Sequence, residues 1–122
     1  MKVLKCNKCG KVVELLHEGC PVVMCCGEEM KELTANTTDA AKEKHVPTYT
    51  IDGDKLIVTV GEIEHPMEEE HYIEWIAVES DDEVQRIYLT PGFEPTATFQ
   101  VKDNMTIYAY CNLHGLWKTE VK

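Results

Sequence analysis

The sequence predicts a mainly β protein, in which a small metal-stapled N-terminal domain precedes an immunoglobulin-like antiparallel β-sandwich. Five of the six cysteines lie in the first 34 residues, a segment too short to fold on apolar burial alone. From Val46 onward, about seven short segments with β-strand character alternate with turn-forming residues. No segment has the convincing apolar period of an amphipathic helix. We therefore expect two domains, at residues 1–36 and 37–122.

Composition limits the classes of partner. The chain has 122 residues, of which 12 are basic and 22 acidic, and its net charge is −10. Such a surface repels nucleic acids and anionic membranes. The N-terminus lacks the apolar run of a signal peptide, and no later segment approaches a membrane span. In a reducing compartment, six cysteines point to metal ligation, so we expect a cytoplasmic metalloprotein.

Four cysteines of the N-terminal domain form a first candidate metal site. They are a Cys-x-x-Cys pair and an adjacent pair, Cys6, Cys9, Cys25 and Cys26. Four thiolates suit tetrahedral iron or zinc. A glycine follows each pair and can take the positive φ that aims backbone N–H groups at a thiolate. Adjacent ligands should strain the tetrahedron, because neighbouring side chains normally diverge. Cys20 and His17 are expected to be non-ligands.

The rest of the chain divides into a linker and strands. Residues 35–44 are small and polar, and we interpret them as a linker that includes at most a helical turn. The turn at residues 52–54 predicts a hairpin of strands 47–51 and 55–60. Two further strand pairs are expected, 71–79 with 83–89 and 96–101 with 106–111, and residues 114–121 close the sandwich.

Four histidines and a cysteine of the second domain form a second candidate site. A single histidine is usually a solvated or hydrogen-bonded side chain. Here five potential ligands fall at strand ends and loops that can meet at one end of a sandwich. Five strong ligands exceed the needs of zinc or blue copper and suit iron with one position left open. The set is His45, His65, His71, Cys111 and His114.

Three segments of the second domain carry a family resemblance. Residues 43–47 (EKHVP), 65–71 (HPMEEEH) and 110–115 (YCNLHG) resemble the three signatures of the superoxide reductases. The N-terminal cysteine pattern resembles desulforedoxin, and the two joined in this order resemble the desulfoferrodoxin family over essentially the whole chain. The resemblance implies two mononuclear irons. One would be a tetrahedral site of four cysteines, and the other a square-pyramidal site with the four histidines equatorial and Cys111 axial.

The resemblance also implies the activity. Superoxide would be reduced by one electron to hydrogen peroxide at the non-haem ferrous site of four histidines and one cysteine, without evolution of oxygen. Rubredoxin or a similar small donor would re-reduce the iron, and the protein would be a homodimer. Glu43 would bind ferric iron in the resting state, and Lys44 would lie beside the open position. A lysine there also supplies the positive charge that draws a small anion to an acidic protein.

Two other functions compete with superoxide reduction. The chain could be a non-catalytic iron-binding electron carrier of rubredoxin or desulforedoxin type, with a structural histidine site. A structural metal site is normally closed by four ligands. Five candidate ligands with a lysine beside them therefore argue against a purely structural role. Superoxide dismutation would require the metal to oxidise superoxide as readily as it reduces it, and an axial thiolate opposes this by stabilising ferric iron.

Overall fold

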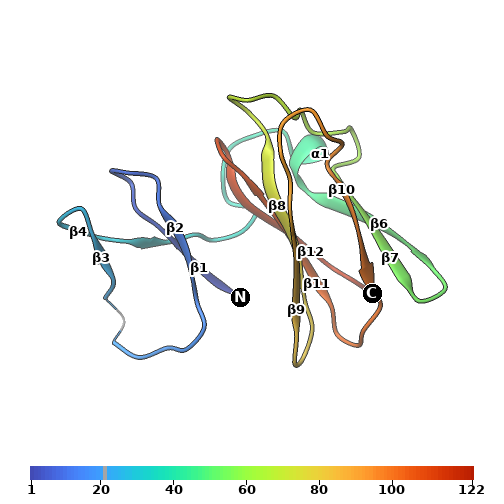
Figure 1. Ribbon diagram of the computed structural model, residues 1–122, viewed down its shortest axis with the longest axis horizontal. Helices are drawn as coiled ribbons and strands as arrows, with labels where there is room; N and C mark the ends of the chain where they lie inside the picture. The colour runs from blue at the N-terminus through green and yellow to red at the C-terminus, as the bar shows by residue number, and fades with distance from the viewer. Residues whose placement is uncertain (21) are drawn as a thin grey trace. The chain divides into compact units, whose positions relative to one another are not determined.

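The computed structural model describes residues 1–20 and 22–122 (Figure 1). These residues form two compact units, Met1–Thr34 and Ala35–Lys122. The regular secondary structure of both units consists almost entirely of short antiparallel strands, and the smaller unit holds four clustered cysteines. The predicted mainly β fold is confirmed. No helix within the described ranges has the length and apolar character that crossing a membrane requires.

The smaller unit consists of two small sheets. Strands β1 (Lys2–Lys5), β2 (Val12–Leu15) and β5 (Lys31–Glu32) form one sheet in the order β2-β1-β5, and β3 (Met24–Cys25) pairs with β4 (Glu28–Glu29). Its buried core is Leu4, Cys6 and Met30, flanked by partly buried Val13, Leu15, Val23 and Cys25. A core of this size offsets only a small part of the entropy that the chain loses on folding. The unit therefore depends on its cysteine cluster for stability.

The larger unit is a sandwich of two antiparallel sheets. One sheet has the order β10-β7-β6, built from β6 (Pro47–Asp52), β7 (Lys55–Val60) and β10 (Thr96–Gln100). The other has the order β12-β11-β8-β9, built from β8 (Ile73–Glu79), β9 (Val84–Tyr88), β11 (Thr106–Cys111) and β12 (Gly115–Glu120). This division into three and four strands is that of an immunoglobulin-like sandwich.

The core lies between the two sheets because inward-facing positions alternate along each strand. On β7 the inward residues Leu56, Val58 and Val60 have no exposed surface, as their spacing predicts. On β11 the same alternation turns Ile107, Ala109 and Cys111 into the core. The β8 pairing of β11 shifts register between Tyr110 and Cys111, which marks a bulge. Cys111 is therefore an inward-facing thiol at a strand end whose direction the bulge adjusts.

One predicted pairing is wrong. Residues 96–101 and 106–111 were expected to form a hairpin, but β10 pairs with β7 and β11 pairs with β8 and β12. The two strands face the core from opposite layers, and the connection between them crosses from one sheet to the other. Met105 in that connection is buried, and its Sδ accepts the Lys102 N–H at 3.3 Å. Alternation alone gives the same pattern for both layers, so it does not specify the partner strand.

Side-chain hydrogen bonds join the edges of the two sheets. The Gln85 amide on β9 donates to the Gln100 carbonyl at 3.1 Å and accepts the Gln100 N–H at 3.0 Å. On the opposite seam, Thr119 Oγ1 of β12 donates to the Pro47 carbonyl of β6 at 2.7 Å. These bonds satisfy backbone groups of edge strands that would otherwise be open to other chains. They also fix the spacing of the loops at the ends of the sandwich.

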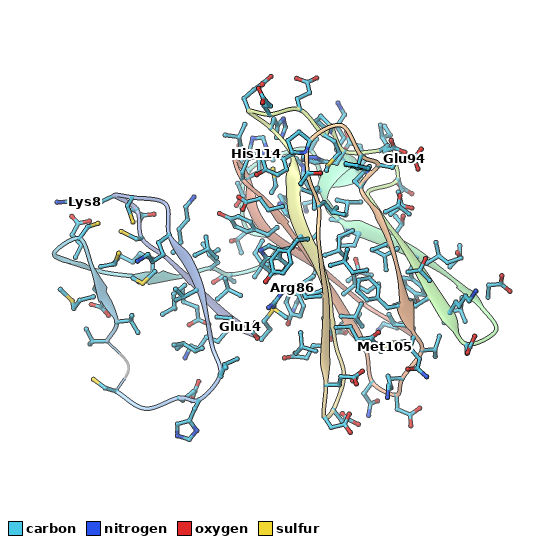
Figure 2. The ribbon with its side chains drawn as sticks, viewed as in Figure 1. Lys8, Glu14, Arg86, Glu94, Met105 and His114 are labelled. Carbon is cyan, nitrogen blue, oxygen red and sulfur yellow. The ribbon has the colours of Figure 1, made fainter. Side chains whose placement is uncertain are left out.

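The loops that carry the histidines gather at one end of the sandwich. The one-turn helix α1 (Lys42–His45) lies there, beside the connection from β7 to β8 and the turn from β11 to β12 (Figure 1). Figure 2 shows His114 near this end and Met105 toward the other. The second candidate site is therefore built on loops at a single end of a rigid scaffold.

Candidate metal centres

The four cysteine sulfurs of the smaller unit converge. The ligand atoms of Cys6, Cys9, Cys25 and Cys26 all lie within 4.8 Å of one another. The Sγ atoms of Cys9 and Cys25 are 3.7 Å apart, and those of Cys25 and Cys26 are 3.9 Å apart. A tetrahedral ion with metal–sulfur bonds of about 2.3 Å places its sulfurs about 3.8 Å apart. The cluster therefore has the dimensions of a tetrathiolate metal site.

A tight turn allows two adjacent cysteines to serve one site. Cys26 and Gly27 are the central residues of the β3–β4 hairpin, with φ of 53° and 75°. Two positive φ angles define a type I′ turn, and the left-handed backbone at Cys26 turns its side chain toward that of Cys25. The strain expected from adjacent ligands is thus absorbed by the backbone.

Backbone N–H groups support the charge on the first cysteine pair. The Cys9 N–H points at Cys6 Sγ across 3.5 Å, and this contact, with help from the Lys8 backbone, lowers the pKa of Cys6 to about 6. Gly10, the glycine after this pair, has φ of 81°, the positive value that the turn requires. Cys20 and His17 are exposed and lie outside the cluster.

Four imidazole rings of the larger unit form a square. Taken in the order His45, His65, His71, His114, successive ring centroids are 4.6, 4.6, 5.0 and 4.9 Å apart, and each ring stands nearly perpendicular to the next. Across the square, the rings of His45 and His71 are 6.2 Å apart and within 30° of parallel. Such an arrangement directs one nitrogen of each ring toward a common centre.

Carbonyl groups fix the tautomers of two of these rings. Nδ1 of His45 lies 2.7 Å from the Ala41 carbonyl, and Nδ1 of His65 lies 2.7 Å from the Pro66 carbonyl. Because a carbonyl only accepts, both Nδ1 atoms carry the proton, and in the neutral rings Nε2 presents a lone pair. These two Nε2 atoms are 3.1 Å apart. Facing lone pairs repel, so this geometry fits a cation held between them.

The other ring nitrogens agree with a cation at the centre. His71 Nε2 is buried and has no hydrogen-bond partner among the described residues. A buried acceptor without a partner is costly unless a metal satisfies it. His114 presents Nδ1, which lies 3.1 Å from His45 Nε2. Hydrogen bonds between Glu68 and His71, at 2.9 and 3.0 Å, hold the His71 loop ahead of β8, which begins at Ile73 rather than at residue 71.

Cys111 supplies a sulfur beside the square of rings. Its Sγ lies 4.0 Å from His114 Nδ1, and the side chain has no exposed surface. The ligand atoms of Cys111, His45, His71 and His114 all lie within 4.8 Å of one another, and His65 joins the group through its contact with His45. The larger unit therefore contains a candidate metal site of three histidines and a cysteine, with a fourth histidine against it.

Burial sets the protonation of these ligands before any metal binds. It lowers the pKa of His65 to about 4 and lowers the pKa of His45 and of His71 as well. Burial raises the pKa of the Cys111 thiol. At neutral pH the metal-free site therefore holds neutral imidazoles at His45, His65 and His71, which are ready to coordinate, and a protonated thiol, which is not.

Glu43 and Lys44 lie on α1, directly before His45, and both are exposed. Burial has the largest effect on the pKa of His45 and His71, and the Lys44 charge lowers both further. The ammonium group thus acts on two opposite rings of the square. Glu43 lines a groove with Lys42 and Glu62, and it is outside the described group of clustered ligand atoms.

Asn112, which sequence reasoning did not single out, ties two ligand loops together. Its Oδ1 accepts the Tyr72 N–H at 2.9 Å, and its Nδ2 donates to the Glu70 carbonyl at 3.0 Å. The Asn112 N–H also donates to the Tyr72 carbonyl at 3.2 Å. The Cys111–His114 turn is thereby joined to the segment on both sides of His71. The signal available in the sequence was an amide residue inside a Cys-x-x-His turn.

Trp117 supports two ligands at once. It is fully buried, and its Nε1 donates to the His114 carbonyl at 3.1 Å. Its ring lies 4.9 Å from that of His45, at 30° between planes. Trp117 therefore packs against the ring of one candidate ligand and holds the backbone of another. Trp75 instead stacks on Tyr110 at 5.8 Å, with the Arg86 guanidinium 4.8 Å from its ring centroid.

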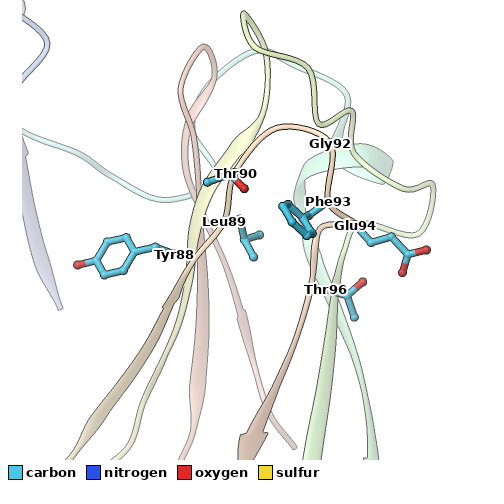
Figure 3. A pocket seen from close by; sticks show the side chains of 7 residues that line it. All are labelled: Tyr88, Leu89, Thr90, Gly92, Phe93, Glu94 and Thr96. Carbon is cyan, nitrogen blue, oxygen red and sulfur yellow. The ribbon is translucent and has the colours of Figure 1, made fainter.

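A separate hollow of the sandwich contains none of the candidate metal ligands. It measures about 660 Å³ and follows the connection from β9 to β10, where no histidine or cysteine lines it. Figure 3 shows Phe93 and Glu94 at one side and the Tyr88 ring pointing away from them. The Gly92 N–H of this connection donates to the Met67 carbonyl at 2.9 Å, which braces the loop between His65 and His71.

Comparisons with known proteins agree with this architecture. A family model described as desulfoferrodoxin matches residues 37–120, and one described as the desulfoferrodoxin N-terminal domain matches residues 1–33. A desulfoferrodoxin homolog from Archaeoglobus fulgidus is 51% identical over 120 residues, which is 98% of this chain and 96% of that protein. Desulfoferrodoxin from Nitratidesulfovibrio vulgaris is 47% identical over 120 residues, or 98% and 95% of the two chains.

A solved structure is similar over nearly the whole chain. The superoxide reductase from Treponema pallidum matches with a TM-score of 0.74 at 31% identity, over 95% of this chain and 98% of that one. A β-sandwich with a histidine and cysteine metal site at one end, preceded in the sequence by a four-cysteine unit, therefore places the chain among the superoxide reductases. The chain belongs to the desulfoferrodoxin family, as the sequence motifs indicated.

Replacing Asn112 with alanine should weaken metal binding at the histidine and cysteine site. The change removes both side-chain bonds that join the Cys111–His114 turn to the His71 loop, and loss of such supporting bonds typically costs about 10- to 100-fold in metal affinity. Competition with a chelator measures the affinity. Leu113→Ala, a change of an exposed side chain in the same turn, is the control. An Asn112→Ala protein that binds metal as tightly as the control would contradict this role.

Metal binding to the larger unit should release about one proton at pH 7, because burial keeps the Cys111 thiol protonated and keeps His45, His65 and His71 neutral. Calorimetric zinc titration in buffers of different ionisation enthalpy measures this release, and Cys111→Ala should lower it by about one proton.

The lowered pKa of His65 also predicts that the metal-free protein loses stability as pH falls from 6.5 toward about 4. Across that window the unfolded chain binds protons that the buried rings do not. Stability that is flat from pH 7 to 4 would refute this assignment.

Proposed function

We propose that this chain reduces superoxide to hydrogen peroxide at the histidine and cysteine centre, with His45, His65, His71 and His114 as equatorial ligands and Cys111 as axial ligand. The observation that carries the proposal is the square of four rings with a buried thiol beside it. Five donors exceed the four that zinc normally takes, which supports iron at this site. We propose iron at the Cys6, Cys9, Cys25 and Cys26 site as well.

The reaction takes up one electron and two protons for each superoxide. When bound, ferrous iron would supply the electron, and an external donor would restore it. Cys111 would donate electron density from beneath the square, an effect that axial thiolates exert on whatever binds opposite them. His71 and His114 are only partly buried, so one side of the square borders solvent. Water on that side is the proton source we propose.

Lys44 and Glu43 would control access to the open position. Superoxide is an anion, and a protein of net charge −10 repels it unless a local positive charge draws it in. Lys44 is exposed, and its charge reaches the rings of His45 and His71, which supports a steering role. Glu43, two residues before His45, would occupy the open position in the oxidised resting state and leave when substrate arrives.

The cellular setting of this activity is also a proposal. None of the six cysteines forms a disulfide in the structure, which supports a reducing, cytoplasmic environment. We propose rubredoxin or a similar small iron–sulfur protein as the electron donor and a homodimer as the assembly, both on the family resemblance.

Superoxide consumption with and without an added reductant tests the proposed function. The iron-loaded protein should consume superoxide continuously only when a reductant is present, and should yield hydrogen peroxide without oxygen from turnover. The Cys111→Ala variant, which lacks the proposed axial ligand, should lose this activity. Oxygen evolution in the absence of reductant would instead identify a dismutase and overturn the proposal.

Substitution of Lys44 by alanine should slow superoxide capture by about 10-fold at low ionic strength and weaken its salt dependence, because steering by a local charge is screened by salt. Pulse radiolysis over a series of salt concentrations measures both quantities. Lys42→Ala is a matched control, since it removes the same charge from the same turn of helix. If the two substitutions have equal effects, Lys44 acts only through the net charge of the protein and has no specific steering role.

A further inference from the structure

We propose that Gly61 is a positioning residue for this site, an inference that rests on the proposed function. By leaving room for the peptide between Glu43 and Lys44, it would hold Lys44 and His45 in place against the other ligands. Gly61 is buried at the start of the connection from β7 to β8, outside the cluster of ligand atoms. It touches no reacting group, so it would act only through the backbone of α1.

The contact between Gly61 and α1 is made by backbone on both sides. A Cβ at position 61 would lie 2.5 Å from the Glu43 carbonyl oxygen and 2.7 Å from the Lys44 carbonyl carbon. Ordinary contacts of a Cβ begin near 3.4 Å. The obstacle is not a flexible side chain, so no rotamer change relieves it. Because φ at Gly61 lies outside the left-handed region, the glycine is required for space and not for its backbone conformation.

Two hydrogen bonds hold the surfaces of this contact together. The Ile63 N–H donates to the Glu43 carbonyl at 2.8 Å, so the oxygen nearest Gly61 is also the acceptor that ties the two segments. The His65 N–H donates to the Val60 carbonyl at 2.8 Å and closes the turn that contains Gly61. The turn is thus anchored at one end to β7 and at the other to a ligand.

The contact links two ligands that come from different segments. His45 ends α1, and His65 ends the turn that starts after Val60. Their Nε2 atoms are 3.1 Å apart. Behind them, Pro47 of β6 pairs with Val60 of β7, so both segments leave the same pair of strands. The space at Gly61 therefore sets how closely α1, with Lys44 on it, approaches the ring of His65.

A methyl group at position 61 should displace α1 while the β-sandwich stays folded. Relief of a 2.5 Å contact requires the Glu43 and Lys44 backbone to move by nearly 1 Å. A displacement of that size in a reactive site typically costs about 100-fold in rate. Gly61→Ala should accordingly slow superoxide capture by about 10- to 100-fold. Gly19→Ala is the matched control, because a Cβ there meets nothing within 4 Å and φ is again outside the left-handed region.

The first measurement is independent of activity. In zinc-loaded full-length protein, amide hydrogen exchange of Ile63 should be at least about 10-fold faster in Gly61→Ala than in wild type, because the bond to Glu43 is stretched. Gly19→Ala should exchange as wild type does. Unchanged exchange at Ile63 would overturn the inference, whatever the rate of the iron protein. Should wild type fail to reduce superoxide, the proposed function falls while this measurement still decides whether Gly61 positions α1.

A double-mutant cycle separates positioning from general damage. If Gly61 acts through Lys44, then Gly61→Ala should cost much less in a Lys44→Ala background than in wild type. An equal cost in both backgrounds would overturn the role through Lys44. If Gly61→Ala does not fold, Ile63→Pro removes the same N–H donor without adding a Cβ at position 61, and the cycle is run with it. An Ile63→Pro protein that captures superoxide at the wild-type rate would also overturn the inference.

Discussion

The larger unit is organised around a repulsion that only a cation removes. Carbonyl groups of Ala41 and Pro66 hold protons on the outer nitrogens of two rings, and the inner nitrogens of those rings then face each other at 3.1 Å. In a polar loop, water would separate such groups, but His45 and His65 are each only 2% exposed. Part of the favourable free energy of packing therefore offsets the repulsion between these two partially negative nitrogens. That energy is regained when a metal ion binds, so metal binding and folding of this end of the sandwich are thermodynamically linked.

The sandwich is suited to this task because its rigidity lies in the strands and its ligands lie on the loops. The core residues of β7 and β11 have no exposed surface, and side-chain hydrogen bonds close both seams. Asn112, Trp117 and the bond from the Gly92 N–H to the Met67 carbonyl then connect the loops to one another. Because the loops are bonded to one another, a displacement of one loop moves its neighbours, and the site responds as a unit. The smaller unit solves the same problem differently, with two positive-φ residues in one tight turn.

Local sequence patterns predicted most of the strands and singled out the cysteines and histidines that lie together in the structure. Alternation located β7, and histidines outside the alternating segments indicated loops that meet at one end. The sequence could not show that β10 and β11 belong to different sheets, because an apolar pattern shows which residues are buried and not which strand pairs with which. It also could not reveal the space at Gly61 or the contact of Trp117 with His45, since both depend on segments 17 or more residues away. A glycine required for space looks like any turn glycine until its neighbours are known.

The position of the last hairpin has a consequence for the order of events during folding. Cys111 and His114 flank the turn between β11 and β12, and β11 is a central strand that pairs with both β8 and β12. Until that hairpin docks, His45, His65 and His71 lack the sulfur that would tune an iron and the ring that completes the square. The full set of five candidate ligands is therefore present only in a chain whose sandwich is complete. A partly folded chain offers fewer imidazoles and no adjacent thiol, so a metal ion would reach its final environment only after the last hairpin docks.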